Sequence, residues 1–211
     1  MTRVLLATGN PHKLDEVRPV LHPLGMEVVG LDSLDSIPPE PVEDGTTFEA
    51  NARIKATEYA RATGRICLAD DSGLEVDALD GEPGVHSARW SGEGGTRDER
   101  DRANNHKLID AMKDVPEAER TARFVCAMCL AAPDGRVLAE TRGTFEGTIV
   151  IDPRGENGFG YDPHLLVLGE KRTSAELTPE EKNARSHRGE ASRAIAALIA
   201  AGAMNASDRP A

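Results

Sequence analysis

The sequence predicts an α/β protein in which an elongated mixed sheet, with parallel and antiparallel strands, is flanked by helices in two lobes with a cleft between them. Residues 3–29 alternate strand, helix and strand patterns, which is typical of parallel pairing. Residues 121–141 contain two apolar runs joined by a tight turn, which is typical of an antiparallel hairpin. The length of 211 residues suits one domain with a sizeable core.

The strand-helix-strand opening has clear boundaries. The apolar run Arg3–Ala7 predicts a buried strand. Asn10 then supplies a helix cap and Pro11 the first helical residue, where the missing N–H of proline costs nothing. Gly25 ends the helix, and Met26–Val29 predict the second strand.

A second helix is predicted to begin after Thr46, which has capping-box spacing to Glu49. Beyond this helix, Ile66–Ala69 and Leu74–Val76 predict two short strands. We expect Asp70–Gly73 to form the turn between them, because Asp, Ser and Gly favour turns.

The rest of the chain continues the alternation of helices and strands. The expected elements are a helix over residues 97–113, strands over 121–132 and 137–141, a glycine-rich loop over 155–160, a strand over 164–168, and helices beginning after Thr178 and spanning 191–201. Residues 1–202 form the predicted domain, and residues 203–211 are expected to be a disordered tail.

Charge and hydropathy exclude several classes of partner. The formal net charge of −11 gives no general attraction for a phosphate backbone, so we expect no nucleic-acid partner. No apolar stretch approaches the roughly 20 residues of a membrane span, and the N-terminus lacks a signal pattern. We therefore expect a cytoplasmic protein without a membrane partner. Cys67, Cys126 and Cys129 lie in apolar runs and are expected to be buried, reduced thiols.

The first candidate site follows the first strand and consists of Thr8, Gly9, Asn10, Pro11, His12 and Lys13. A strand that ends in a small polar loop points the N–H groups of the following helix at an anion, and Lys13 adds a positive charge. This pattern predicts phosphate binding. A capped strand-helix junction without a ligand has the same pattern, and the segment is not a Walker loop.

The second candidate site is a pair of carboxylates, Asp71 and Glu43. The side chains of Asp70 and Asp71 point to opposite sides of an extended backbone, so only one of them enters a given pocket. Mg²⁺ bound with a triphosphate takes one or two protein carboxylates, so Asp71 with Glu43 would suffice. The alternative is that these acidic residues only close turns.

The third candidate site is an aromatic loop made of Phe159, Gly160, Tyr161 and Asp162. Aromatic residues alternate with glycine here in a chain that is only 3% aromatic, so their clustering calls for an explanation. An aromatic face beside a carboxylate suits a nucleobase. The alternative is a turn whose aromatic side chains fill the core.

The fourth candidate site concentrates donors near the C-terminus, on Lys182, His187 and Arg188. The guanidinium of Arg188 is a planar fork of donors without an acceptor, so it can favour a purine carbonyl over an amino group. The alternative is a solvated basic helix end.

Five motifs, in this order, resemble the inosine triphosphate pyrophosphatase family, and within it the bacterial dITP/XTP pyrophosphatases. They are TGNPHK, EDGTTFEANA, ADDSGLEVDALDGEPGVHSARW, GFGYDP and ELTPEEKNARSHRG. The resemblance covers residues 3–202. It implies hydrolysis of ITP, dITP and XTP to the monophosphate and pyrophosphate, together with Mg²⁺ and a homodimer.

The resemblance also implies a role for each matching residue. Residues 8–13 would hold the phosphates. Asp71 would be the proton acceptor and a Mg²⁺ ligand, Glu43 the second ligand, and Ser72 would touch the substrate. The residues that would hold base and sugar are Phe159, Gly160, Tyr161, Asp162, Lys182, His187 and Arg188.

Two other functions stay open at this point. One is a pyrophosphatase for modified pyrimidine triphosphates, as in the septum-inhibitor-like proteins of similar fold. The other is a nucleotide-sensing module that binds without turnover, in which the Asp71 carboxylate is structural. A panel of triphosphates assayed with and without Mg²⁺ distinguishes the three.

Overall fold

The computed structural model describes residues 2–204 and divides into two compact units. Unit 1 comprises Met1–Asp71, Cys126–Gly143 and His187–Ala211, and unit 2 comprises Ser72–Val125 and Thr144–Ser186. Six strands form one sheet in the order β2-β1-β3-β4-β5-β6. Strand β1 pairs in parallel with β2 and β3, whereas β5 and β6 are antiparallel, so the predicted mixed sheet is confirmed.

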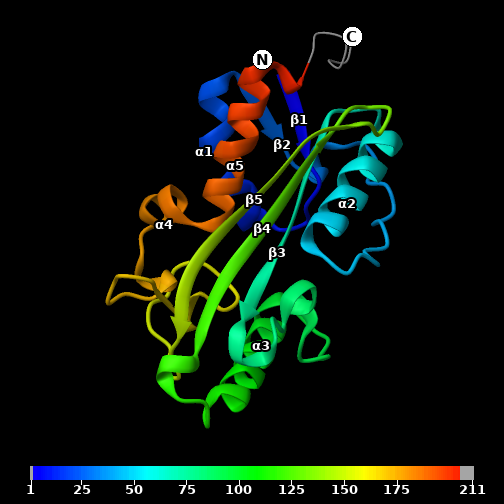
Figure 1. Cartoon of the computed structure of the whole chain (residues 1–211). Coiled ribbons are helices and arrows are strands. Elements are labelled where there is room, and N and C mark those ends of the chain that lie inside the picture. The colour runs from blue at the N-terminus through cyan, green and yellow to red at the C-terminus, as the bar shows by residue number, and fades with distance from the viewer. Residues whose placement is uncertain (1, 205–211) are drawn as a thin grey trace. The chain divides into compact units, whose positions relative to one another are not determined.

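The regular elements are labelled in Figure 1, apart from the short β6. The strands are β1 (Thr2–Leu6), β2 (Met26–Val29), β3 (Cys67–Val76), β4 (Thr121–Ala131), β5 (Val137–Ile149) and β6 (Leu165–Val167). The α-helices are α1 (Pro11–Leu21), α2 (Phe48–Thr63), α3 (Arg97–Met112), α4 (Pro179–Arg185) and α5 (His187–Leu198).

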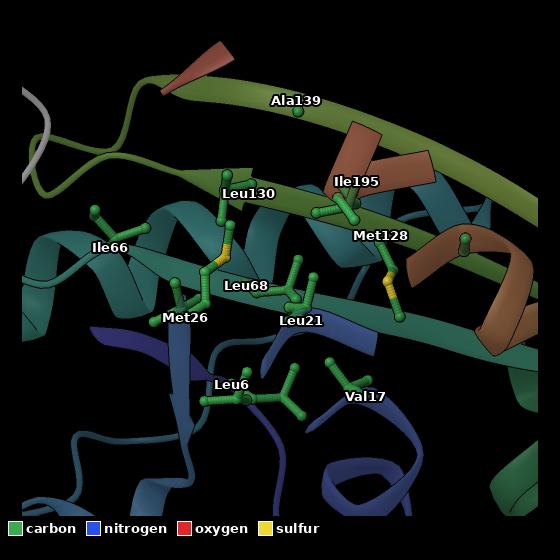
Figure 2. Close-up of a cluster of buried hydrophobic side chains, with 14 of the residues drawn as sticks. Leu6, Val17, Leu21, Met26, Ile66, Leu68, Met128, Leu130, Ala139 and Ile195 are labelled. Carbon is green, nitrogen blue, oxygen red and sulfur yellow. The ribbon is translucent and has the colours of Figure 1, made fainter. Parts of the chain in front are cut away.

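In unit 1, helices α1 and α5 cover one face of the strands and α2 covers the other (Figure 1). The first face holds a cluster of buried side chains that includes Leu6, Leu68, Val17, Leu21 and Ile195 (Figure 2). Val17 and Leu21 share a helix face because they lie four residues apart. Each fully buried side chain of this kind contributes about 1.5–3 kcal/mol relative to its exposed state, so this face fixes α1 and α5 on the sheet.

The start of α1 is as the sequence predicts. The Asn10 side chain accepts a hydrogen bond from the His12 N–H at 3.1 Å, and Pro11 is the first helical residue. The helix ends earlier than expected, at Leu21, and a short 3-10 turn then leads to Gly25. Gly25 adopts φ = 75°, a left-handed conformation that favours glycine.

The predicted turn at Asp70–Gly73 is wrong, because β3 runs without interruption through it. The carboxylates of Asp70 and Asp71 are bound by Lys13 and Asn51, which lie on helices. Neither carboxylate therefore has to accept the hydrogen bond from a nearby backbone N–H that stabilises an Asp in a turn. Gly73 serves a different purpose in unit 2. A Cβ atom at this position would overlap the Oγ of Ser87, so the glycine permits the close approach of residues 84–87.

The predicted cap of α2 is shifted by one residue. Thr47, and not Thr46, accepts a hydrogen bond from the Ala50 N–H, at 3.2 Å. Glu49 therefore falls outside capping-box spacing, and its carboxylate pairs with Arg142 at 2.7 Å. The capping box of α4, formed by Thr178 and Glu181, is present as predicted.

Unit 2 has its own core around the distal halves of β3, β4 and β5. Its buried side chains include Leu74, Phe124, Phe145, Leu108 and Tyr161.

Strand β5 is longer than the predicted strand and continues through Gly143 and Gly147. A Cβ atom at either glycine would overlap the backbone of a neighbouring segment, so these glycines serve close packing.

The C-terminal region starts its last helix earlier than predicted, at His187. Met204 is buried in the core of unit 1, and residues 205–211 of the predicted tail lie outside the described residues. The three cysteines are free and buried, as predicted. Between residues 2 and 204, the helices are too short or too polar to cross a membrane.

Candidate functional site

The two adjacent aspartates of β3 belong to different surroundings within unit 1. In an extended strand successive side chains point to opposite faces, so Asp70 faces α1 and α5 while Asp71 faces α2. The Asp70 side chain has no exposed surface, and that of Asp71 is 12% exposed. Only Asp71 is therefore open to a ligand.

Asp70 is bound by two cations. Its Oδ2 lies 3.0 Å from Lys13 Nζ and accepts a hydrogen bond from Arg188 Nε at 3.1 Å. A second guanidinium nitrogen of Arg188 contacts Glu16 of α1. Burial acts to raise the pKa of Asp70, but Lys13 and Arg188 outweigh it, and the pKa lies well below its usual range. Asp70 is thus a buried carboxylate whose charged form is favoured and whose contacts hold Lys13 and Arg188 in place.

Asp71 is bound from the opposite face by α2. Its Oδ2 accepts a hydrogen bond from Asn51 Nδ2 at 3.1 Å, and its Oδ1 lies 3.4 Å from Lys55 Nζ. Burial raises the pKa of Asp71, and the opposing effects of Lys55, Lys13 and the Asn51 hydrogen bond do not fully offset it. The carboxylate is held in one orientation, with part of its surface accessible.

Lys55 also reaches the loop before α2. Its Nζ lies 3.0 Å from Glu43 Oε2, so one ammonium contacts both Glu43 and Asp71. Burial lowers the pKa of Lys55, but Asp71, Asp70 and Glu43 raise it by more, and the side chain stays charged. The same loop is tied to α2 by a hydrogen bond of 2.9 Å from the Gly45 N–H to Asn51 Oδ1.

Sequence reasoning missed Asn51, Lys55 and Glu16. A signal for the first two was present in α2, where polar residues four apart share a helix face. Phe48, Ala52 and Ala56 make the surrounding part of that helix apolar, so a polar pair buried there requires partners. Glu16 gave no such signal, because a single Glu on α1 resembles an ordinary surface residue.

The residues present fit a divalent cation. Glu43 and Asp71 converge on the Lys55 ammonium, which shows that two carboxylates face a single cationic position. Carboxylate oxygens are the ligands Mg²⁺ prefers, and it needs only one or two from the protein when a triphosphate supplies others. No group of three or more His, Cys, Asp or Glu side chains that could hold a metal ion occurs among the described residues.

The segment from Thr8 to Lys13 comprises the end of the loop after β1 and the first turn of α1. The Thr8 Oγ1 accepts a hydrogen bond from the Asn10 N–H at 3.1 Å, which closes the loop on itself. Gly9, Pro11 and His12 are exposed, so the first turn of α1 is accessible. Lys13 extends from this turn to Asp70, with 15% of its side chain exposed. Lys13 is thus paired with Asp70 and the His12 N–H with Asn10, and phosphate binding by this segment stays a prediction.

His187 and Arg188 occupy the first turn of α5 and belong to unit 1. Both are buried, with 5% and 1% of their surface exposed. The guanidinium of Arg188 forms ion pairs with Asp70 and Glu16, so Arg188 holds these two carboxylates together.

In unit 2, Asp162 connects the aromatic loop to α4. Its Oδ2 accepts hydrogen bonds from the Phe159 N–H at 2.8 Å and from Lys182 Nζ at 2.7 Å. Its Oδ1 accepts one from Ser174 Oγ at 2.7 Å. Lys182 Nζ also lies 5.3 Å from the centre of the Phe159 ring, a favourable cation–π distance. Four of the predicted site residues of unit 2 therefore lie together: Phe159, Gly160, Asp162 and Lys182. The fifth, Tyr161, lies in the buried core of unit 2, and Ser72 is half-buried on β3.

The comparison with protein families decides the identity of this arrangement. A model of the Ham1 family matches residues 4–198. The chain belongs to the Ham1 family. The resemblance found in its motifs is thereby confirmed.

Curated relatives of this Ham1 chain match over nearly its whole length. It is 52% identical to the dITP/XTP pyrophosphatase of an Exiguobacterium species, with 93% of this chain and 96% of the relative covered. It is 49% identical to the dITP/XTP pyrophosphatase of Corynebacterium efficiens, with 94% and 97% covered.

Solved Ham1 structures share the fold. A HAM1 protein from Coxiella burnetii superposes with a TM-score of 0.84 at 37% identity, covering 96% of this chain and 100% of the other. The nucleoside-triphosphatase, or dITP/XTP pyrophosphatase, of Mycobacterium abscessus gives 0.72 at 46% identity, covering 93% and 98%.

Proposed function

We propose that this chain hydrolyses the deaminated purine nucleoside triphosphates ITP, dITP and XTP to the monophosphate and pyrophosphate, and so cleanses the nucleotide pool. Two relatives that are 52% and 49% identical to this chain are dITP/XTP pyrophosphatases. The observation that carries the proposal is the arrangement of Asp71, Glu43 and Lys55, because two carboxylates directed at one cation suit a magnesium-triphosphate substrate.

Asp71 and Glu43 are the residues that would hold Mg²⁺. When bound, the ion would supply Lewis-acid activation of the phosphate chain and neutralise part of its charge. Asn51 keeps Asp71 oriented, and its bond to Gly45 keeps the loop of Glu43 beside it. The chain thus provides the two carboxylates in a fixed relation before substrate arrives.

Asp71 is the proposed general base. It accepts a proton from a water molecule whose oxygen attacks the α-phosphorus. The bond from the α-phosphorus to the bridging oxygen then breaks, and pyrophosphate leaves with the bonding electrons. Lys13, whose charge also acts on Asp71, and the positive end of the α1 dipole would stabilise the charge that grows on the leaving group. Asp70 keeps Lys13 extended from its helix for this task.

Base recognition is assigned to the aromatic loop and the nearby donors. The half-buried Phe159 offers an aromatic face, Tyr161 packs next to it in the core of unit 2, and Lys182 is a donor fixed by Asp162. Donors suit the 6-keto group of hypoxanthine and xanthine, whereas the 6-amino group of ATP would leave them unpaired. Contacts of His187 and Arg188 with base or sugar remain predictions. GTP carries the same keto group, so its exclusion has to involve the 2-position.

A pyrophosphate-release assay tests the function. The substrates are ITP, dITP, XTP, GTP, ATP and dUTP, each with and without Mg²⁺. We expect magnesium-dependent release that is fastest with the first three. Preference for dUTP would indicate a pyrimidine pyrophosphatase, and binding of ITP without turnover would indicate a sensing module. A cytoplasmic location and a homodimer belong to the proposal, and the dimer is checked by light scattering of the purified protein.

A further inference from the structure

Helix α3 of unit 2 holds one residue of the aromatic loop by both of its backbone polar groups. The Gly160 N–H donates a hydrogen bond to Asp101 Oδ2 at 3.1 Å, and the Gly160 carbonyl accepts one from Asn105 Nδ2 at 3.0 Å. Asp101 and Asn105 are four residues apart, so they project from the same face of the helix. Together they form a clamp on the residue between the two aromatic rings.

The same helix also reaches Tyr161 indirectly. Asn104 donates a hydrogen bond to the Ser87 carbonyl at 3.1 Å and accepts one from the Ser91 N–H at 2.8 Å. The Tyr161 hydroxyl donates to that Ser87 carbonyl as well, at 2.8 Å. Helix α3 therefore fixes Gly160 directly and Tyr161 through Ser87.

The rest of the loop is held from its other side. Asp162 binds the Phe159 N–H and the Lys182 ammonium, so the backbone next to the Phe159 ring is anchored before and after the glycine. Gly160 adopts φ = 62°, in the left-handed region that favours glycine, and it has no side chain that could restrain its backbone. The two bonds from Asp101 and Asn105 therefore restrain a backbone position that glycine would otherwise leave free to move.

We propose that Asp101 and Asn105 are positioning residues for nucleobase recognition: they set the orientation of the Phe159–Tyr161 loop and thereby the preference for a 6-keto purine. This inference rests on the proposed function. A base-recognising surface discriminates only when its groups are held in place, because discrimination depends on contacts that misplacement weakens. Neither residue needs to touch the substrate.

The test uses the full-length protein and compares ITP with ATP. The variants are Asp101→Ala, Asn105→Ala and the double variant. Asp101→Asn keeps an acceptor for the Gly160 N–H. Asp110→Ala removes an exposed carboxylate from the same helix and serves as the matched control. The measurements are kcat and KM for both nucleotides, inhibition by pyrophosphate, which lacks a base, and the melting temperature.

For the double variant we expect the KM for ITP to rise about tenfold with a smaller change in kcat, and the ratio of kcat/KM for ITP over ATP to fall about tenfold. Inhibition by pyrophosphate stays at its wild-type value, because the phosphate-binding residues belong to unit 1. Asp101→Asn and Asp110→Ala are expected within about twofold of wild type.

An ITP-over-ATP ratio that is unchanged in the double variant overturns the proposal, whatever happens to the melting temperature. A fall in kcat with every nucleotide and an unchanged ratio would show a merely structural clamp. If the double variant does not fold, the ratio of kcat/KM for ITP over ATP is measured on Asn105→Ala instead, and an unchanged ratio overturns the proposal in the same way. A wild-type protein that hydrolyses no purine triphosphate refutes the proposed function and this inference with it, whereas an active wild type with insensitive variants refutes only the clamp.

Discussion

Asp70 and Asp71 are neighbours in β3, yet they are held by different helices and have opposite shifts in pKa. The pKa of Asp70 is lowered, because the effects of Lys13 and Arg188 exceed that of burial. The pKa of Asp71 is raised, chiefly by burial. One residue is a structural anion and the other an accessible carboxylate, so substitutions at the two positions have different consequences.

Asp71→Asn is expected to reduce turnover of ITP by about 100-fold or more, because the amide can neither accept the proton nor bind a cation as a carboxylate does. The melting temperature is expected to change little. Steady-state kinetics and thermal unfolding measure the two effects. Asp44→Asn, at an exposed position beside Glu43, is the control. Turnover within about threefold of wild type would remove Asp71 from the mechanism.

Asp70→Asn is expected to lower the free energy of unfolding by about 3 kcal/mol, because it removes the anionic partner Asp70 from the fully buried guanidinium of Arg188. Urea unfolding measures the change. The control is Asp15→Asn, which removes an exposed contact with Arg18 and is expected to cost about 0–1 kcal/mol. Equal stability of the two variants would contradict the structural role of Asp70.

Asn51→Leu removes two hydrogen bonds with little change in volume. It leaves the Gly45 N–H and one oxygen of Asp71 without their partner, so the carboxylates of Glu43 and Asp71 lose their fixed relation. We expect the Mg²⁺ concentration for half-maximal activity to rise about tenfold, as for other residues that orient metal ligands. A magnesium titration at saturating ITP measures it, with Glu58→Leu, at an exposed position on α2, as the control. An unaltered titration curve would show that Asn51 does not position the carboxylates.

Gly158→Ala tests the Asp162 centre of unit 2. Gly158 and Gly92 have similar left-handed backbones, with φ = 80° and 78°, but a Cβ atom at 158 would overlap the Asp162 carboxylate, whereas that at 92 meets nothing. The backbone strain is thus common to both alanine variants, and only Gly158→Ala displaces Asp162. We expect it to raise the KM for ITP about tenfold while Gly92→Ala does not. Equal kinetics would mean that the position of Asp162 is irrelevant to substrate binding.

His164 is expected to make stability depend on pH. Burial lowers its pKa from the ordinary 6.5, although its bond to the Val150 carbonyl opposes this. The unfolded chain then binds the proton more readily, so the neutral His164 favours folding fully above pH 6.5, and this contribution is lost as pH falls through the folded pKa. His164→Asn should therefore lose less stability than wild type between pH 7.5 and about 5.5, measured by urea unfolding. His22→Asn, at an exposed position, is the control, and a parallel loss in all three proteins would exclude this effect.

The local features of the chain were predictable because they depend on residues close together in sequence. Asn10 and Pro11 specify the start of α1, and Thr178 with Glu181 specifies the start of α4. Strand β2 has the predicted bounds, since an apolar run bounded by glycines allows few alternatives. The motifs that carry the family resemblance are of the same local kind.

The sequence by itself determined the fold class, the family and the residues to inspect, because short-range propensities and motifs are written in adjacent positions. Tertiary structure alone decided that Asp70–Gly73 continues a strand, because the partners that satisfy these carboxylates, Lys13, Lys55 and Arg188, come from three separate helices. It also decided which aspartate is accessible and that α3 clamps Gly160. Burial and long-range ion pairing set these outcomes, and neither can be evaluated until distant segments have come together.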